Sequence, residues 1–257
     1  MIGVFDSGVG GLTVVAQLKK QLPEVSFVYL GDNARTPYGN RSPEVIKKYC
    51  RDNVDFLISC GAQAIVVACN TASALAGEFL RQTYDLPIFE VITPAARIAV
   101  ANSRGCIGII GTRGTINSGA YKQAIKILNN QVEIFSQPCP LFVSLVEEGW
   151  LKKPESKMIA RKYLTPLKNK NIDTLILGCT HYPLMKKIIQ AKIGRQVRLI
   201  DPAEEVVKEL KEFLNRKPDF PLNGGRSEFY STDPDARFKE IAKNWLKEEI
   251  DLKRAQW

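Results

Sequence analysis

The segment 175-LILGCTHYPL-184 decides the fold class of this 257-residue chain. Its apolar run ends in a glycine, and Cys179, Thr180 and His181, the only histidine, follow at once. A helix is predicted directly after them. A strand that opens into a polar loop before a helix is typical of open parallel α/β sheets, which bind their ligands at the carboxyl ends of the strands.

A second copy of this segment, 64-AIVVACNTAS-73, lies 110 residues earlier and has Cys69, Asn70 and Thr71 at the matching places. Three more apolar segments recur in the same order, at offsets between 105 and 108 residues. Four matches in register indicate an internal duplication. The other three pairs are 1–7 with 106–112, 25–28 with 132–135, and 88–95 with 197–203.

We therefore predict an α/β fold with two pseudo-symmetric domains, each a small parallel sheet flanked by helices, and an active site in the cleft between them. The first domain is expected to comprise residues 1–97 and 206–257, and the second residues 98–205. The tail after residue 206 has no counterpart between the halves. We expect in it a helix, a connection at 218–225, a strand at 227–230 and a final helix capped by Asp233-Pro234, packed on the first half.

The composition is that of a globular protein, with 45% hydrophobic and 25% charged residues. No apolar run reaches the roughly 20 residues that span a bilayer, and the first residues have no signal-peptide pattern. The six cysteines form no CxxC pair, which argues against a zinc ribbon or a thioredoxin-like site. We predict a cytoplasmic protein with reduced thiols and no membrane partner.

The net charge of +9 does not by itself indicate a nucleic-acid partner. The lysines are spread along amphipathic segments such as 152–170 and 208–217 instead of forming one basic patch with interleaved aromatic residues. We therefore expect no nucleic acid. A basic field would attract a small acidic substrate.

Two loops in the first half have the composition of binding loops. The segment 6-DSGVGG-11 joins a predicted strand to a predicted helix and is neither GxGxxG nor a P-loop. Its glycines fit a loop whose N–H groups hold a phosphate or a carboxylate, and they fit equally a tight turn that needs glycine for steric reasons. The long polar loop at 31–39 is where a substrate lid would lie.

When the carboxyl ends of the two sheets face each other, each wall of the cleft carries one thiol. Inversion of a stereocentre by proton transfer needs a base on one face of the carbon and an acid on the other, and the two exchange roles in the reverse direction. Matched thiols suit this reaction, because a cysteine can act as either partner when a neighbour stabilises its thiolate. The residues expected to face each other are Asp6, Ser7, Asp32, Cys69 and Asn70 on one wall, and Thr112, Thr115, Cys179, Thr180 and His181 on the other.

In this arrangement Asp6 would orient one thiol and His181 the other. Hydroxyl groups of Ser7, Thr71, Thr112 and Thr180 would hold carboxylates. The sequence has no pyridoxal phosphate lysine signal, metal cluster or dinucleotide fingerprint, so the chemistry is expected to need no cofactor and no metal.

Four motifs together resemble the glutamate racemases of the aspartate/glutamate racemase superfamily: DSGVGG at 6–11, GD followed by PYG at 31–39, CNTA at 69–72 and GCTHYP at 178–183. The resemblance covers essentially the whole chain. It implies a cofactor-independent isomerase, a homodimer, that supplies D-glutamate for peptidoglycan, the cell-wall polymer that determines cell shape.

The resemblance also implies individual roles. Cys69 would take the α-proton from D-glutamate and Cys179 from L-glutamate. The family's substrate-binding positions match Asp6-Ser7, Tyr38-Gly39, Asn70-Thr71 and Thr180-His181. Supporting acidic positions match Asp32 and Glu147, the latter within LVEEG, where Glu148 is adjacent.

Three other functions remain open on the sequence. A sister racemase acting on aspartate or a hydantoin would share the two-cysteine mechanism, although the PYG and CTHYP motifs favour glutamate. A thiol hydrolase would use Cys179 as nucleophile with His181 and would leave Cys69 without a role. A two-lobed amino-acid binding protein would tolerate serine at both cysteines.

Overall fold

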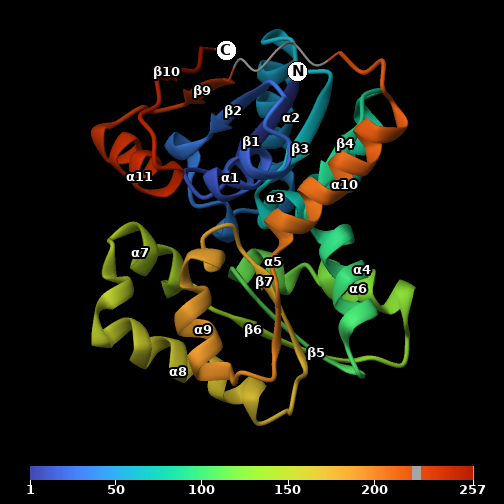
Figure 1. Cartoon of the computed structure of the whole chain (residues 1–257), viewed down its shortest axis with the longest axis vertical. Helices are drawn as coiled ribbons and strands as arrows, with labels where there is room; N and C mark the ends of the chain where they lie inside the picture. The colour runs from blue at the N-terminus through green and yellow to red at the C-terminus, as the bar shows by residue number, and fades with distance from the viewer. Residues whose placement is uncertain (222–226, 257) are drawn as a thin grey trace.

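The chain folds into two parallel β-sheets, each flanked by helices, that lie one above the other in Figure 1. The computed structural model describes residues 1–221 and 227–256. The first sheet has the order β10-β9-β2-β1-β3-β4 and the second the order β6-β5-β7-β8, with every pairing parallel. The expected α/β class with two parallel sheets is confirmed.

The largely buried strands β1, β2, β3, β5 and β7 fall at predicted apolar segments, because parallel strands covered on both faces need near-continuous apolar runs. The strands of the first sheet are β1 (Ile2–Asp6), β2 (Phe27–Gly31), β3 (Ala64–Val67), β4 (Ile88–Glu90), β9 (Ser227–Ser231) and β10 (Leu252–Arg254). Those of the second are β5 (Cys106–Gly111), β6 (Glu133–Pro138), β7 (Thr174–Gly178) and β8 (Arg198–Ile200).

The internal duplication is visible in the strand order. The segment β2-β1-β3-β4 of the first sheet has the same order as β6-β5-β7-β8 of the second. Each of these four strands of the first sheet corresponds to one strand of the second sheet, at the offset seen in the sequence. Strand β3, before Cys69, thus corresponds to β7, before Cys179. The two cysteines therefore leave equivalent central strands at the carboxyl edge of each sheet.

Helices cover both faces of each sheet. They are α1 (Leu12–Gln21), α2 (Pro43–Ser59), α3 (Asn70–Thr83), α4 (Ile92–Asn102), α5 (Arg113–Asn117), α6 (Ala120–Leu128), α7 (Leu141–Glu147), α8 (Pro154–Lys168), α9 (Lys186–Ile193), α10 (Pro202–Arg216) and α11 (Ala236–Leu246). The helix expected directly after His181 begins with a 3₁₀ turn, η4 (Tyr182–Met185). None of the described helices combines the length and the apolar character needed to cross a bilayer.

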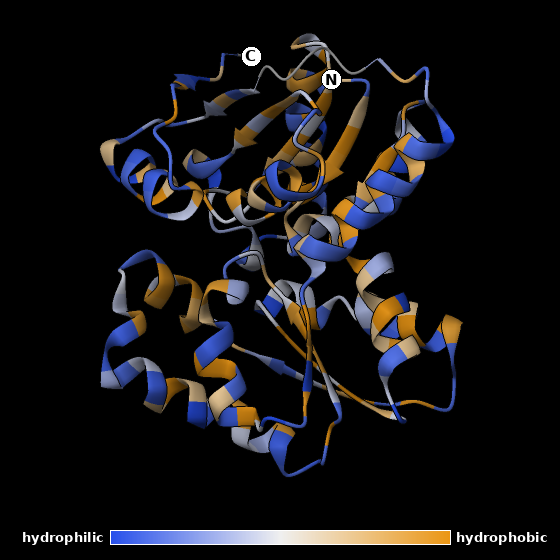
Figure 2. Ribbon diagram, viewed as in Figure 1, coloured by the Kyte–Doolittle hydropathy of each residue, from blue (hydrophilic) through white to orange (hydrophobic). Residues whose placement is uncertain are grey.

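Buried side chains form three clusters. One packs α2 and α3 on the first sheet, a second packs α7, α8 and α9 on the second sheet, and the third joins both halves through α1, α4 and α10. Figure 2 shows apolar strands inside and polar helix surfaces outside. The third cluster ties the two halves together over a shared core.

The tail adds two strands and a helix to the first half. Strand β9 pairs with β2, and β10, which the sequence did not predict, pairs with β9. The predicted Asp233-Pro234 cap is wrong: the N-cap of α11 is Asp235, two residues after Asp233, and its side chain accepts the hydrogen bond from the Phe238 N–H at 2.6 Å. The connection predicted at 218–225 lies partly outside the described residues.

The predicted domain boundaries fall inside two continuous helices. The boundary after residue 97 lies within α4, which packs against α6 and β7 of the second half. The boundary after residue 205 lies within α10, which packs against α1 of the first half as well as α4. The division into two domains at these residues stays a prediction.

Candidate active site

A cavity of about 320 Å³ lies where the two halves meet at the carboxyl ends of their strands. This is near the lower end of the volumes of small-molecule sites. Both predicted thiols line it. Its lining from the first half is Ser7, Gly8, Val9, Asn33, Thr36, Pro37, Tyr38, Gly39, Cys69, Asn70 and Thr71, and from the second half Thr112, Val143, Glu147, Cys179, Thr180 and His181. The tail contributes Asp233, Asp235, Arg237, Phe238 and Ile241.

Cys69 is the N-cap of α3 and is almost fully buried. Its sulfur accepts a hydrogen bond from the Ala72 N–H at 3.5 Å and lies 3.6 Å from the Ser7 hydroxyl. Burial and the nearby Asp6 carboxylate raise the pKa of the Cys69 thiol to about 12, and the charge of Cys179 also raises it. Cys69 is therefore a thiol at neutral pH, and it lines the same cavity as Cys179.

On the opposite wall, three side chains form a chain of contacts. The Cys179 sulfur lies 3.9 Å from Nδ1 of His181, and Nε2 of His181 lies 2.9 Å from Oε1 of Glu147. Burial alone would lower the pKa of His181, but the hydrogen bonds with Cys179 and Glu147 outweigh it and raise this pKa to about 10. The cavity wall therefore carries a positive charge on the His181 imidazolium, 3.9 Å from the Cys179 sulfur.

Glu147, and not its neighbour Glu148, is the partner of the histidine. Burial acts to raise the pKa of Glu147, but the hydrogen bond and the charge of His181 hold it below its ordinary value. Glu148 instead pairs with Arg237 of α11 at 2.7 Å, across the mouth of the cavity.

Asp6 lies behind the cavity wall and is fully buried. Its Oδ2 accepts a hydrogen bond from the Gly8 N–H at 3.0 Å, whereas its Oδ1 has no hydrogen-bond partner among the described residues. Desolvation raises the pKa of Asp6 to about 6, despite the charge of His181, which lowers it. Asp6 therefore influences Cys69 by its charge and does not itself line the cavity.

Three threonine hydroxyls form a closed ring between the two halves. Oγ1 of Thr71 lies 2.9 Å from that of Thr112 and 3.2 Å from that of Thr115, and the latter two are 3.0 Å apart. Thr71 and Thr112 line the cavity, but Thr115 is buried behind them. The ring fixes the hydroxyls that a substrate carboxylate would contact.

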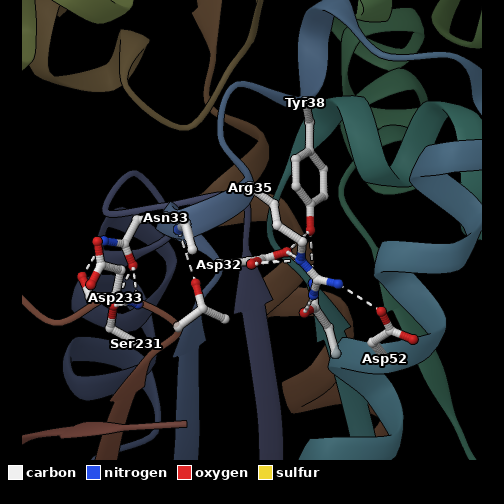
Figure 3. A network of polar contacts seen from close by, with 10 residues as sticks. Asp32, Asn33, Arg35, Tyr38, Asp52, Ser231 and Asp233 are labelled. Atoms are coloured by element: carbon white, nitrogen blue, oxygen red, sulfur yellow. Dashed lines mark hydrogen bonds and ion pairs between the residues drawn. The ribbon is translucent and has the colours of Figure 1, made fainter. Parts of the chain in front are cut away.

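Asp32 lies in a network of polar contacts with the loop that follows β2 (Figure 3), and it does not line the cavity. Its carboxylate accepts two hydrogen bonds from Nε of Arg35, at 2.9 and 2.7 Å, and one from the Tyr38 hydroxyl. Nη1 of Arg35 also contacts Asp52 at 2.6 Å. The predicted substrate-binding role of Asp32 thus has no direct geometric support, because its oxygens are already used to place Tyr38.

Some residues that line the cavity were not predicted from the sequence. Asn33 is bonded to Ser231 and Asp233, which ties the loop after β2 to the segment before α11 (Figure 3). That segment and α11 supply the five tail residues of the lining. The tail lies outside the duplicated pattern, so no sequence signal placed it at the cleft.

One position of the glycine-rich loop at 6–11 requires glycine, because the two halves approach each other closely there. A Cβ at Gly10 would lie 2.2 Å from Oγ1 of Thr180 and 2.5 Å from Cε1 of His181. The steric interpretation of the loop therefore holds at Gly10. The Thr13 hydroxyl adds a bond from this loop region to the Thr180 carbonyl oxygen at 3.0 Å.

The structure thus gathers most of the predicted site residues at one cavity. Lining it are Ser7, Tyr38, Gly39, Cys69, Asn70, Thr71, Thr112, Glu147, Cys179, Thr180 and His181, whereas Asp6, Asp32 and Thr115 lie behind its wall. No three His, Cys, Asp or Glu side chains within the described residues are grouped to hold a metal ion. Fold and site together define a two-lobed α/β protein with one cysteine thiol on each wall of a shared cavity.

Comparison with known proteins gives the family. The family model for Asp/Glu/hydantoin racemases matches residues 2–210. A glutamate racemase of Geobacter metallireducens is 50% identical over 83% of this chain and 79% of its own length. One of Streptococcus equi subsp. equi is 45% identical over 98% of this chain and 96% of its own length.

Solved structures agree. Glutamate racemase isoform RacE1 of Bacillus anthracis has a TM-score of 0.95 at 39% identity, covering 100% of this chain and 97% of that one. The glutamate racemase of Francisella tularensis, solved in complex with D-glutamate, has a TM-score of 0.93 at 38% identity, covering 99% and 97%. The chain belongs to the Asp/Glu/hydantoin racemase family and is an amino-acid racemase.

Proposed function

We propose that this racemase interconverts L- and D-glutamate without a cofactor: one of the thiols Cys69 and Cys179 removes the α-proton, and the other gives its own proton to the opposite face of the carbon. The observation that carries the proposal is the pair of thiols at equivalent strand ends on opposite walls of one cavity. The relatives compared above are glutamate racemases, and the F. tularensis enzyme was solved with D-glutamate.

The protonation states on the two walls suit proton transfer. In the L-to-D direction, a Cys179 thiolate takes the α-proton, so that the C–H bond breaks and an S–H bond forms. Cys69 then gives the proton of its thiol to the opposite face of the carbon. The structure supports this direction, since Cys69 is a thiol at neutral pH and His181 carries a positive charge beside Cys179. In the D-to-L direction the two sulfurs exchange roles.

The polar groups around the thiols suit a substrate with two carboxylates. The cavity offers the amide of Asn70 and the hydroxyls of Ser7, Thr71, Thr112 and Thr180. Amide and hydroxyl groups can donate hydrogen bonds to a carboxylate, and bonds to an ionised acceptor are stronger than those between neutral groups. We propose that these groups hold the carboxylates of glutamate.

We further propose a cytoplasmic homodimer that provides D-glutamate for peptidoglycan. All six cysteines are free, and a mechanism with two thiols needs the reducing conditions of that compartment. Gel filtration with light scattering tests the dimer. Loss of wall synthesis on depletion of the protein, reversed by added D-glutamate, tests the role in the cell.

The first test is incubation of purified, dialysed protein with L-glutamate in D₂O, followed by circular dichroism and by NMR of the α-proton. Loss of optical activity together with deuterium at the α-carbon is expected. A parallel incubation with aspartate tests the sister activity. No inversion and no exchange from either enantiomer would refute the racemase function proposed for glutamate.

The second test asks whether racemisation requires Cys69 and Cys179 but not the other cysteines. Cys69→Ser and Cys179→Ser are each expected to lose nearly all racemisation while they still bind D-glutamate in calorimetry. Cys139→Ser is the matched control, since Cys139 is also buried but does not line the cavity. Near wild-type turnover in either of the first two variants would exclude the mechanism. Acylation of Cys179 by an ester would favour a hydrolase, and full binding without turnover in the wild type would favour a binding protein.

A further inference from the structure

The residue next to Cys69 is held by a side chain from the opposite half. Asn70 is the first residue of α3, lines the cavity and is almost fully buried. Its Oδ1 accepts a hydrogen bond of 2.6 Å from the hydroxyl of Tyr121, which lies on α6. Tyr121 is itself buried, and its ring packs near Gly178, just before Cys179.

This hydrogen bond determines which end of the Asn70 amide faces the cavity. A buried phenol must place its proton on an acceptor, and Asn70 provides the only hydrogen-bond acceptor for Tyr121 within the part of the chain that the structure describes. The oxygen of the amide must therefore point at Tyr121, because the NH₂ group cannot accept a proton. Burial, with nearby Glu90, Asp201 and Cys179, raises the pKa of Tyr121 well above its ordinary value, so the phenol keeps its proton.

The NH₂ group of Asn70 is left for a ligand. Nδ2 has no hydrogen-bond partner among the described residues and is not among the fully buried unpartnered atoms. Because Asn70 lines the cavity, this donor is available to a carboxylate there. The reversed amide would present an oxygen to that carboxylate and would repel it.

A similar hydrogen bond runs in the opposite direction, from a side chain of the first half to the residue after Cys179 in the second half. Thr13, on α1 of the first half, donates to the carbonyl oxygen of Thr180, the residue after Cys179, at 3.0 Å. Thr13 and Tyr121 are each the second residue of their helix, and 108 residues separate them, close to the 110 between Asn70 and Thr180. Each half thus fixes the residue that follows the cysteine of the other half.

We propose that Tyr121 is a positioning residue, which orients the Asn70 amide so that its NH₂ group binds a carboxylate of the substrate. The proposal rests on the function proposed above. It assigns Tyr121 no contact with the substrate and no part in proton transfer. Its effect should therefore appear in KM, for both enantiomers, and should depend on the presence of Asn70.

The test is a double-mutant cycle with Tyr121→Phe and Asn70→Ala, measured by circular dichroism from both enantiomers. Tyr121→Phe is expected to raise KM about tenfold, the effect of one lost hydrogen bond, with a smaller change in kcat. Asn70→Ala should raise KM at least as much. The double variant should match Asn70→Ala, because the phenol acts only through the amide.

Two further variants keep the test decisive. Asn70→Asp still accepts the Tyr121 proton and so preserves the packing, but it presents an oxygen to the substrate, and its KM should rise tenfold or more. Tyr182→Phe is the matched control, because it removes an equally buried hydroxyl that donates to the Cys139 carbonyl at 2.9 Å, and its KM should stay near the wild-type value.

Any of three results would overturn the role of Tyr121. They are an unchanged KM in Tyr121→Phe, a KM in the double variant raised by the product of the two single-variant factors, and a near wild-type KM in Asn70→Asp. A wild-type protein that does not act on glutamate would instead refute the proposed function, so the two failures are distinguishable.

Discussion

Asp6→Asn should make the protein more stable at neutral pH while reducing its activity. The pKa of Asp6 rises from 3.8 to about 6 because burial of the carboxyl group outweighs the charge of His181 and the hydrogen bonds to the carboxyl group, which act to lower the pKa. A carboxyl with a raised pKa binds its proton more tightly in the folded state. Its favourable contribution is therefore complete below pH 3.8 and is lost as the pH rises through about 6.

The magnitude follows from the same shift. Above pH 6 the folded protein carries an ionised carboxylate that costs about 3 kcal/mol relative to the unfolded chain. Asparagine has no such cost and keeps an acceptor for the Gly8 N–H. The difference in unfolding free energy between Asp6→Asn and the wild type should grow by about 2 to 3 kcal/mol between pH 4 and pH 8.

Urea denaturation at several pH values between 4 and 8 measures this difference, and the racemase assay on the same samples measures the lost activity. Asp85→Asn, at an exposed carboxylate outside the site, is the control for removal of a surface charge. A difference between Asp6→Asn and the wild type that does not change with pH would show that Asp6 is not destabilised by its burial, and would refute the reasoning. Gain of stability with loss of turnover is the expected trade-off at an active site.

Three more predictions follow from contacts of the site. Glu147→Gln should lower the pKa of His181 from about 10 and reduce kcat/KM by tenfold or more, with a larger reduction at higher pH. Glu148→Gln should change kcat/KM little. Equal reductions of kcat/KM in the pH–rate profiles of the two variants would contradict this. Gly10→Ala should abolish turnover in the racemase assay, since its Cβ would lie 2.2 Å from the Thr180 hydroxyl. The control Gly77→Ala lies within α3, where the new Cβ would have no atom closer than 3.7 Å, and it should raise the unfolding free energy by about 0.5 to 1 kcal/mol in urea denaturation. A fully active Gly10→Ala would disprove the close contact. Asp32→Asn should raise KM through a loosened Tyr38 and increase proteolysis of the loop at 33–39; a loop as resistant as in the wild type would argue against the organising role of Asp32.

The secondary-structure elements and their repetition could be predicted from local sequence patterns. Apolar runs such as AIVVA and LILG end in polar loops, and this local pattern places Cys69 and Cys179 at the carboxyl ends of equivalent strands, whatever the rest of the chain does. The order of the segments and their nearly constant spacing then specify two sheets with the same strand order. The prediction that two thiols lie at equivalent strand ends thus follows from local information alone.

The contacts where the two halves meet could not be predicted in this way, and they became visible in the folded chain. Which of two adjacent glutamates contacts His181 depends on the orientation of one helix end, and the bond of Tyr121 to Asn70 joins side chains 51 residues apart. Asp32 has the residue type of a ligand-binding carboxylate, but Arg35 and Tyr38 already occupy its oxygens. Such contacts depend on packing between elements distant in sequence, and neither periodicity nor propensity encodes that packing locally.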